Sequence, residues 1–404
     1  RPMRSCLRRF ALDVVCARKA SPVVFLSRKK YRYSSGQQQQ AYRHTAAFAS
    51  ADWRRGEREE TGRQEMKEKV IKMKERSKVW LDCDPGHDDA MAILLAGYSP
   101  DQVELIGIST VHGNQSVAKT TTNALACLEA FGLSNVTCVK GQGQPLCREA
   151  KHCAEIHGES GLDDLQGNPL FPHTERIKPV EGKCVNVMQK AFLDHYEEGN
   201  SGNKIKLVAT GALTNVAILL TVYPELKDTI EVIFMGGAYG LGNTGPVSEF
   251  NMQIDPEAAK VVFNSGAKVT MIPLEVTHTA LATKEVVASI RQDGKSKLRN
   301  ALCELLYFFK DSYKSYFGFD DPPLHDPCAV AYVIDPKLFE VEHIRVDVET
   351  GSELCAGQTV CDRHNLKGKE RNAHVAYAMK VDAFWDLILK AIDRAEEQMK
   401  DTRS

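Results

Sequence analysis

The chain has 404 residues, of which 26% are charged and 43% hydrophobic, and its formal net charge is −1. These values are typical of a globular protein with one large domain or two ordinary ones. The charge balance gives no support for a nucleic-acid or anionic-membrane partner, and no apolar run approaches the length of a membrane span. The twelve cysteines form no CxxC pairs, which argues against zinc ribbons and favours reduced thiols in an intracellular protein.

Residues 1–75 differ in composition from the rest of the chain. The first fifty carry eleven Lys or Arg and a single acid, Asp13. Two interpretations are open: a mitochondrial transit peptide, or sequence that precedes a translation start at Met66 or Met73. We favour the second, and with it a cytoplasmic location. In both cases we expect residues 1–75 to be disordered, because they lack the apolar surface that offsets the entropy of folding, and residues 76–400 to form one domain.

From Lys78 onward, short β-branched runs alternate with helix-like segments. In chain order, the pattern predicts strands at 78–84, 103–111, 135–141, 205–211, 230–237 and 267–276. It predicts helices at 88–97, 116–131, 183–198, 213–222, 255–264, 283–293 and 297–316. The last part adds a short helix after Pro327, strands at 343–350, 357–363 and 374–382, and a helix at 384–400.

The predicted strands are continuously apolar over four to six residues, as in strands that are covered on both faces. Their alternation with helices indicates right-handed βαβ units. The fold class that follows is α/β: a single Rossmann-like domain with a doubly wound, mostly parallel sheet. Ligands of such sheets bind outside the carboxyl ends of the strands, and there the chain places segments rich in Gly, Asn, Asp and Thr.

The segment "LDCDPGHDDA" at residues 81–90 places four aspartates at the first of these strand ends. Capping of a helix start explains Asp88 or Asp89. It does not explain Asp82 and Asp84, because a carboxylate at the end of a buried strand is costly without a positive neighbour. Two interpretations follow: a bound Ca²⁺ or Mg²⁺ ion, or capping combined with a buried hydrogen-bond network.

A phosphatase of the haloacid-dehalogenase type would also place an Asp-x-Asp pair after its first strand and hold Mg²⁺ there. In that case Asp82 would be the nucleophile. The segment Pro-Gly-x-Asp-Asp that follows here departs from that pattern.

The stretch "DCDPGHDDAMAILLA" resembles the signature of the inosine–uridine-preferring nucleoside hydrolases, DxDPGxDDxxAxxxA. Further stretches agree with that family in the same order, among them "STVHGNQSVAKTTTNAL", "EIHGESGLDDL", "LVATGALTNVA", "SEFNMQIDPEAA" and "HDPCAVAYVIDP". The resemblance covers roughly residues 76–398. It implies a single α/β domain, a small ribonucleoside as substrate, no nucleic-acid or membrane partner, and a homodimer or homotetramer.

The resemblance also implies a set of site residues. A Ca²⁺ ion would be held by Asp84, Asp89, the backbone carbonyl of Thr210, and Asp326. Ribose hydroxyls would be bound by Asp88 and Asn251, and the 5′-hydroxyl end by Asn243 and Glu249. Further pocket residues would be Asn114 and Met235, with His157 on a loop over the substrate and Tyr313 beside the base.

The implied reaction is hydrolysis of the N-glycosidic bond to ribose and a free base. Asp84 would deprotonate a metal-bound water, and His325, partly charged near neutral pH, would protonate the leaving base. Glu155 and Phe309 stand where some relatives have His and Tyr, which leaves the base preference open. A third possibility is a nucleoside-binding protein without catalytic activity.

Overall fold

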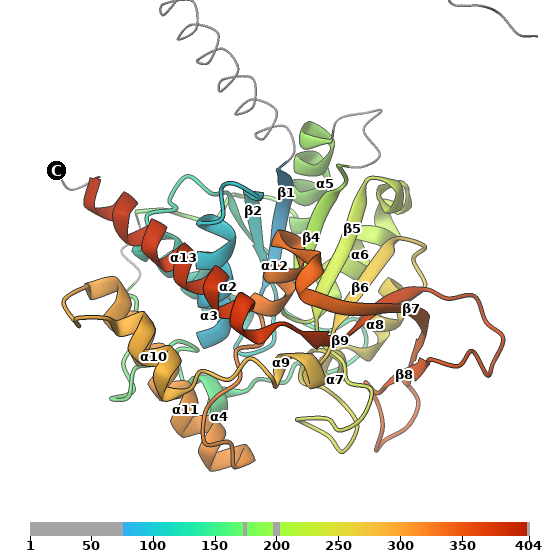
Figure 1. Ribbon diagram of the computed structural model, residues 1–404. Coiled ribbons are helices and arrows are strands. Elements are labelled where there is room, and N and C mark those ends of the chain that lie inside the picture. The colour runs from blue at the N-terminus through green and yellow to red at the C-terminus, as the bar shows by residue number, and fades with distance from the viewer. Residues whose placement is uncertain (1–75, 173–175, 197–202, 402–404) are drawn as a thin grey trace, which may run out of the picture. The chain divides into compact units, whose positions relative to one another are not determined.

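The computed structural model describes residues 76–172, 176–196 and 203–401 (Figure 1). The predictions for residues 1–75, including both interpretations of that segment, lie outside these described residues. None of the helices in the described part of the chain has the length and apolar content needed to span a bilayer.

The described strands form one nine-stranded sheet with the order β3-β2-β1-β4-β5-β6-β9-β7-β8. The first seven strands of this order, from β3 to β9, pair in parallel. Strand β7 pairs antiparallel with β9 on one side and with β8 on the other. This arrangement confirms the mostly parallel sheet. The strands are β1 (Ser77–Cys83), β2 (Val103–Thr110), β3 (Cys138–Lys140), β4 (Ile205–Ala209), β5 (Ile230–Met235), β6 (Lys268–Ile272), β7 (Phe339–Val348), β8 (Thr359–Asp362) and β9 (Ala373–Met379).

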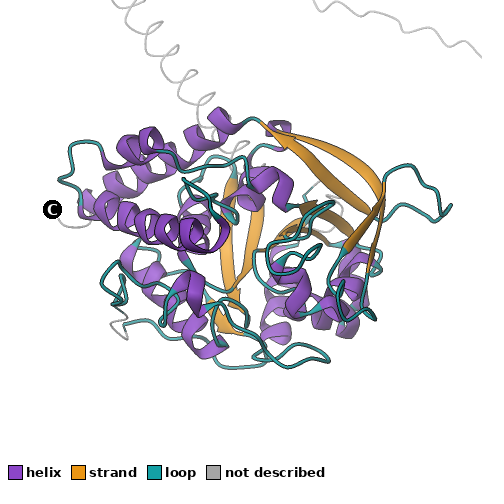
Figure 2. Ribbon diagram, turned by 90° about the horizontal axis from the view of Figure 1, so that it is seen from below, coloured by secondary structure: helices purple, strands orange, loops and turns teal. Residues whose placement is uncertain are grey.

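Helices cover both faces of the sheet (Figures 1 and 2). The longer ones are α2 (His87–Gly97), α3 (Val117–Ala130), α5 (Cys184–His195), α6 (Thr214–Val222), α8 (Pro256–Phe263), α10 (Lys284–Arg291), α11 (Lys297–Phe317), α12 (Pro327–Ile334) and α13 (Val381–Asp401). The short ones are α4 (Ala154–His157), α7 (Phe250–Ile254), α9 (Leu274–Thr277), η1 (Pro224–Asp228) and η2 (Pro336–Leu338).

The two faces of the sheet have separate cores, and β1 shows how the sequence supplies both. Val79 and Leu81 belong to the core with α2, α12 and α13, whereas Trp80 packs in the core with α5, α6 and α8. Successive side chains of a strand point to opposite faces, so a strand between two helical layers needs the unbroken apolar run that β1 has. The doubly wound α/β fold is therefore confirmed.

Several predicted elements differ from the structure, and three of the differences bear on the site or the sheet. The strand predicted at 267–276 ends at Ile272, because Pro273 cannot donate to the ladder, and Leu274–Thr277 forms α9. The short α7 was not predicted; its start is capped by the Glu249 carboxylate, which accepts from the N–H of Asn251. Strand β7 begins at Phe339, four residues before the predicted start at 343.

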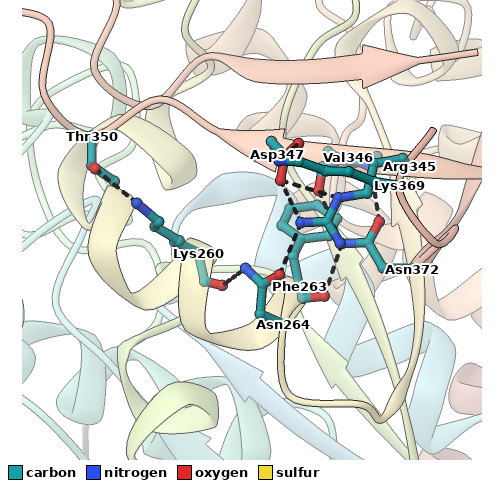
Figure 3. Close-up of polar contacts among 9 residues, drawn as sticks. All are labelled: Lys260, Phe263, Asn264, Arg345, Val346, Asp347, Thr350, Lys369 and Asn372. Carbon is teal, nitrogen blue, oxygen red and sulfur yellow. Dashed lines mark hydrogen bonds and ion pairs between the residues drawn. The ribbon is translucent and has the colours of Figure 1, made fainter. Parts of the chain in front are cut away.

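A cluster of polar contacts joins β7 to the end of α8 (Figure 3). We call it the Arg345 cluster; its members are Asn264, Arg345, Asp347, Lys369 and Asn372. Arg345 Nε donates to Asp347 Oδ1 at 3.0 Å, and Lys369 Nζ lies 2.9 Å from Asp347 Oδ2. Asn372 donates to the carbonyl oxygens of Phe263 and Val346, both at 2.9 Å. Each charge in this cluster therefore has a partner of opposite sign.

Candidate active site

The strand order reverses at β1, which has β2 on one side and β4 on the other. At such a switch point the connections leave the sheet in opposite directions, and a crevice opens at the carboxyl ends of the strands. A cavity of about 280 Å³ lies here. It is lined by Asp88, Asn114, Cys153, Glu155, Ile156, His157, Thr210, Met235, Asn243, Thr244, Glu249, Phe250, Asn251, Phe309, Tyr313, Tyr316, Phe317, His325 and Asp326.

All of the site residues predicted from the sequence line this cavity except Asp84 and Asp89. These two carboxylates are buried in contact with residues of its wall: Asp84 Oδ2 accepts from the N–H of Asn114 at 2.8 Å, and Asp89 Oδ1 accepts from Thr210 Oγ1 at 2.8 Å. The structure thus brings together side chains from sequence positions 84 to 326.

Three of the aspartates converge. Asp88, Asp89 and Asp326 each offer an oxygen, and these oxygens all lie within 4.8 Å of one another. The first two occupy the opening turn of α2, and the third precedes Pro327 at the start of α12. Asp326 makes no capping hydrogen bond to α12, so helix capping does not account for it. The convergence is an acidic cluster of the kind that holds a metal ion.

This cluster differs in one member from the predicted ligand set, since it contains Asp88 rather than Asp84. Asp84 lies next to it, and its Oδ1 is a buried oxygen without a hydrogen-bond partner among the described residues. Gly113 and Gly211 flank the carboxylate of Asp84, and a β-carbon on either glycine would collide with it. The backbone therefore approaches Asp84 from two sides and leaves one oxygen free for a ligand.

The cluster has no cationic side chain to balance it. Among the described residues that line the cavity, none is a lysine or arginine. Burial, followed by the negative charge of neighbouring carboxylates, raises the pKa of Asp84 and Asp326 well above the usual value, and burial raises the pKa of Asp88 to about 7. Carboxylates so placed repel one another at neutral pH, and a hard divalent cation with a preference for oxygen ligands fits this donor set.

Asp82 lies apart from this cluster. Its Oδ1 accepts hydrogen bonds from Ser109 Oγ at 2.5 Å and from Asn215 Nδ2 at 2.7 Å, and the residue is fully buried and does not line the cavity. Asp82 thus belongs to a buried hydrogen-bond network, as the second interpretation of the four aspartates predicted for part of the segment. It has no access to a phosphate ester, so the phosphatase alternative has no support.

The start of α7 organises another wall. Glu249 accepts from the N–H of Asn251 at 2.9 Å and from the N–H of Gly237 at 2.9 Å, and burial raises the pKa of Glu249 to about 7. Asn251 Nδ2 donates to the carbonyl oxygen of Thr210 at 2.8 Å. Asn243 Oδ1 accepts from the N–H of Phe250 at 3.0 Å. These contacts fix two side-chain amides, those of Asn243 and Asn251, that line the cavity.

His325 lies between two hydroxyl groups. Its Nδ1 is 2.7 Å from Thr277 Oγ1 and its Nε2 is 2.7 Å from the hydroxyl of Tyr313. Thr277 Oγ1 also donates to the carbonyl of Leu274 at 3.3 Å, so it accepts from His325 Nδ1–H, and Nε2 accepts from Tyr313. Burial lowers the pKa of His325 well below the usual value. This direction favours the neutral ring, whereas the sequence led us to expect a partly charged histidine.

Another part of the cavity wall consists of aromatic side chains from α11. Phe309, Tyr313, Tyr316 and Phe317 follow one another at helical spacing on α11 and line the cavity. The ring of Phe309 lies 5.4 Å from the ring of His157, whose pKa burial lowers well below the usual value. Phe309 and Glu155, the two departures from the family pattern, both border the cavity.

The sequence did not indicate several residues that complete the site. Cys153, Ile156, Thr244, Phe250, Tyr316 and Phe317 line the cavity, and Thr277 and His87 hold His325 and His157. The aromatic spacing on α11 was a usable signal for Tyr316 and Phe317. Nothing in the sequence indicated the contact between Thr277 and His325, which are 48 residues apart.

Known proteins resemble the chain over most of its length. A family model described as inosine-uridine preferring nucleoside hydrolase matches residues 79–386. A probable ribonucleoside hydrolase from Dictyostelium discoideum is 47% identical over 322 residues, which cover 78% of this chain and 94% of the relative. A pyrimidine-specific ribonucleoside hydrolase from Shewanella oneidensis is 40% identical over 77% of this chain and 95% of the relative.

A solved structure of a purine-preferring ribonucleoside hydrolase from Gardnerella vaginalis matches the fold with a TM-score of 0.71 at 30% identity, covering 80% of this chain and 100% of that chain. The sequence and the fold thus lead to the same group of enzymes. The chain belongs to the inosine-uridine preferring nucleoside hydrolase family and is an N-glycosyl hydrolase.

Proposed function

We propose that the protein is a Ca²⁺-dependent enzyme that hydrolyses the N-glycosidic bond of ribonucleosides to ribose and a free base. The observation that carries this proposal is the convergence of Asp88, Asp89 and Asp326 beside a cavity without lysine or arginine among its described lining residues. Relatives that prefer purines and relatives specific for pyrimidines both resemble this chain, so the proposal covers both classes of base.

The choice of Ca²⁺ follows from the donor atoms. Asp84, Asp89, Asp326 and the Thr210 carbonyl are the ligands that we propose, and all are oxygen donors. Ca²⁺ takes about 6–8 oxygens, so such a set leaves positions for water and for two sugar hydroxyls. When bound, the ion would orient the ribose and make water more acidic. An oxygen of Asp88 lies within 4.8 Å of ligand oxygens of Asp89 and Asp326, so Asp88 would contact both the ion and a ribose hydroxyl.

We assign Asp84 the role of general base. Its Oδ2 is held by the N–H of Asn114, while its buried Oδ1 is free to accept a proton from the attacking water. Positioned proton transfer of this kind contributes about 10²–10⁴-fold to a rate. A nearby cation would counter the burial and repulsion that raise the pKa of Asp84, and so would keep the carboxylate ionised and ready.

We assign protonation of the leaving base to His325 together with Tyr313. The hydroxyl of Tyr313 lies 2.7 Å from Nε2 of His325 and would position the ring. Because burial lowers the pKa of His325, Nε2 would take up a proton from solvent before it passes that proton to the base nitrogen. The proton that Asp84 takes from water returns to the pair through solvent, and the cycle balances.

Selectivity for ribose would follow from Asp88 and Asn251. Both line the cavity, and Asp88 is also a member of the acidic cluster, where the 2′- and 3′-hydroxyls would bind. A 2′-deoxynucleoside would leave these groups and one cation position unpaired, and such losses lower kcat/KM steeply.

The test is a substrate panel. Purified protein is incubated with inosine, guanosine, adenosine, uridine and cytidine, and ribose release is measured before chelation, after chelation, and after addition of Ca²⁺ or Mg²⁺. We expect release from at least one nucleoside, loss on chelation and recovery with Ca²⁺. Tight nucleoside binding without release would instead favour the non-catalytic alternative, and recovery with Mg²⁺ alone would reject Ca²⁺.

We also propose that residues 76–400 act as one catalytic domain and that the protein is a homodimer or homotetramer, both by resemblance to the family. A chain that begins at residue 76 should keep the activity of the full chain. Light scattering of the purified protein gives the assembly directly, and a monomeric mass at micromolar concentration would reject it.

A further inference from the structure

A second cavity, of about 550 Å³, adjoins the active-site cavity. We call it the side compartment; it is lined by Tyr239, Gly240, Leu241, Gly242, Asn243, Leu274, Glu275, His278, Tyr313, Phe317 and Phe319. Asn243, Tyr313 and Phe317 line both cavities, so the two meet at these side chains. Hydrolysis of a simple ribonucleoside gives the side compartment no role.

The loop that forms one wall of the side compartment is fastened to the helix that forms another. This loop, residues 239–243, follows β5, and Glu275 lies on α9. Oε1 and Oε2 of Glu275 accept from the N–H of Tyr239 at 3.1 and 3.3 Å, and the same carboxylate accepts from the N–H of Gly240. The loop is therefore held in place by backbone hydrogen bonds, and the side compartment has a defined wall.

The lining of the side compartment is mostly apolar. Leu241 is 80% exposed, Tyr239 38% and Phe317 37%, so three large apolar side chains are open to a ligand at one place. No lysine or arginine stands among the described residues that line it, and its one carboxylate there, Glu275, is engaged by the loop. Such a lining disfavours a phosphate or another anion and fits an apolar group.

Ring contacts place the side compartment at the end of the active site that we assign to the base. The ring of His278 lies 5.5 Å from the ring of His325, and the ring of Phe319 lies 6.0 Å from the ring of Tyr313. The aspartates of the acidic cluster, where the ribose hydroxyls would bind, do not line it. A group that enters it would therefore be carried by the base rather than by the sugar hydroxyls.

We propose that the side compartment is a substrate subsite that binds an apolar substituent on the nucleobase, such as an aryl or alkyl group on the exocyclic nitrogen of a purine ribonucleoside. This inference rests on the proposed function and names a class of substrate for it. The active-site cavity alone, at about 280 Å³, is just below the usual range of about 300–1,000 Å³ for small-molecule sites. Together with the side compartment it falls well within that range.

The test measures binding by calorimetry in the presence of Ca²⁺ and compares adenosine with N6-benzyladenosine. Leu241→Asp places a charge in the side compartment. Leu366→Asp is the matched control, because Leu366 is 83% exposed on the segment between β8 and β9 and does not line either cavity. An adenosine with a benzylthio group at C5′ carries the same ring at the other end of the nucleoside.

We expect the wild type to bind N6-benzyladenosine at least about tenfold more tightly than adenosine, which corresponds to about 1.4 kcal/mol. Leu241→Asp should remove most of this gain and leave the affinity for adenosine unchanged, because Leu241 does not line the active-site cavity. Leu366→Asp should keep the gain. Should Leu241→Asp fail to fold, Leu241→Ser takes its place with the same expected direction.

Three results would overturn the proposal: a wild type that binds N6-benzyladenosine no more tightly than adenosine, a gain that survives the change at Leu241, or a Leu241-dependent gain for the C5′ compound alone. These binding ratios need no turnover, so they are separate from the test of the proposed function. A wild type that shows the gain but releases no base from any nucleoside would reject the hydrolase function and leave the subsite supported. Hydrolysis of adenosine without the gain would reject the subsite alone.

Discussion

Two polar regions at different places on the same sheet differ in how they balance charge. In the Arg345 cluster, Asp347 contacts both Arg345 and Lys369, and the pKa of Asp347 is lowered by the hydrogen bond from Arg345. In the acidic cluster of the active site, Asp88, Asp89 and Asp326 face one another, and burial raises the pKa of each. The first region is balanced by the chain itself, whereas the second requires a ligand.

This contrast separates structural from functional carboxylates by a physical criterion. Neutralising a carboxylate that is paired within the chain removes an attraction, so it should destabilise the fold. Neutralising one that faces other carboxylates removes a repulsion, so it should stabilise the metal-free fold and weaken ion binding. The two kinds of region therefore predict opposite signs for the same Asp→Asn change.

The largest effect should come from Asp84→Asn. The amide has the size of the carboxylate but cannot accept a proton from water, so kcat for nucleoside hydrolysis should fall by about 10²–10⁴-fold. The fold should remain, because the N–H of Asn114 can still donate to the amide oxygen at that position. Ribose release and circular dichroism of the same sample measure the two quantities; activity within tenfold of the wild type would remove Asp84 from its proposed role.

The next effect concerns the ion. A ligand at 100 times its dissociation constant stabilises the folded state by about 2.7 kcal/mol, so Ca²⁺ should raise the melting temperature of the chelated wild type. Asp326→Asn should melt at a higher temperature than the wild type when both are metal-free, and should respond little to Ca²⁺. Differential scanning fluorimetry checks both. A metal-free Asp326→Asn protein that is less stable than the wild type would show that the cluster is already balanced within the chain.

The pH dependence of stability should differ between the metal-free and Ca²⁺-loaded proteins. In the metal-free protein the pKa of Asp88 is about 7, above its unfolded value near 4. Between about pH 4 and 7 the folded state therefore binds a proton that the unfolded state has lost. Stability should fall as pH rises through this window, by up to about 1.4 kcal/mol per pH unit for each such proton.

Urea unfolding at several pH values, with and without Ca²⁺, measures this slope. Bound Ca²⁺ holds the carboxylates ionised and should flatten the curve. Equal slopes in the two conditions would mean that no cation interacts with these groups.

The features that could be predicted from the sequence are those with local causes, and the features that could not be predicted depend on contacts between distant residues. The apolar runs predicted the parallel sheet, and the four aspartates of residues 81–90 predicted either a metal site or a buried hydrogen-bond network at the end of β1, because both patterns depend on a few adjacent residues. The lowered pKa of His325 could not be predicted, since it follows from burial and from the nearby His278. Its contacts with Tyr313 and Thr277 also join residues that lie 12 and 48 positions away. Which side chains meet across such distances depends on how the elements pack.

The short elements were missed for a related reason. The five residues of α7 are too few for a periodic pattern, and its start depends on the Glu249 carboxylate, which also accepts from the N–H of Gly237 twelve residues earlier. The sequence resemblance nevertheless singled out Glu249 and Asn251, because a family motif records which residues a site requires even where no local rule explains them.

The smallest effect should come from Asp347→Asn in the Arg345 cluster. This change removes the charge that Arg345 and Lys369 share, but the side chain of Asp347 is 35% exposed, so solvent screens the pair and the loss of stability should be about 0.5–1 kcal/mol. The loss should be the same with and without Ca²⁺, and nucleoside hydrolysis should be unchanged, because the cluster lies outside the cavity. Measured in the same fluorimetry experiment, Asp347→Asn should lower the melting temperature of the metal-free protein and Asp326→Asn should raise it. Stabilisation by Asp347→Asn, or a loss that depends on Ca²⁺, would show that pairing within the chain does not distinguish the two regions.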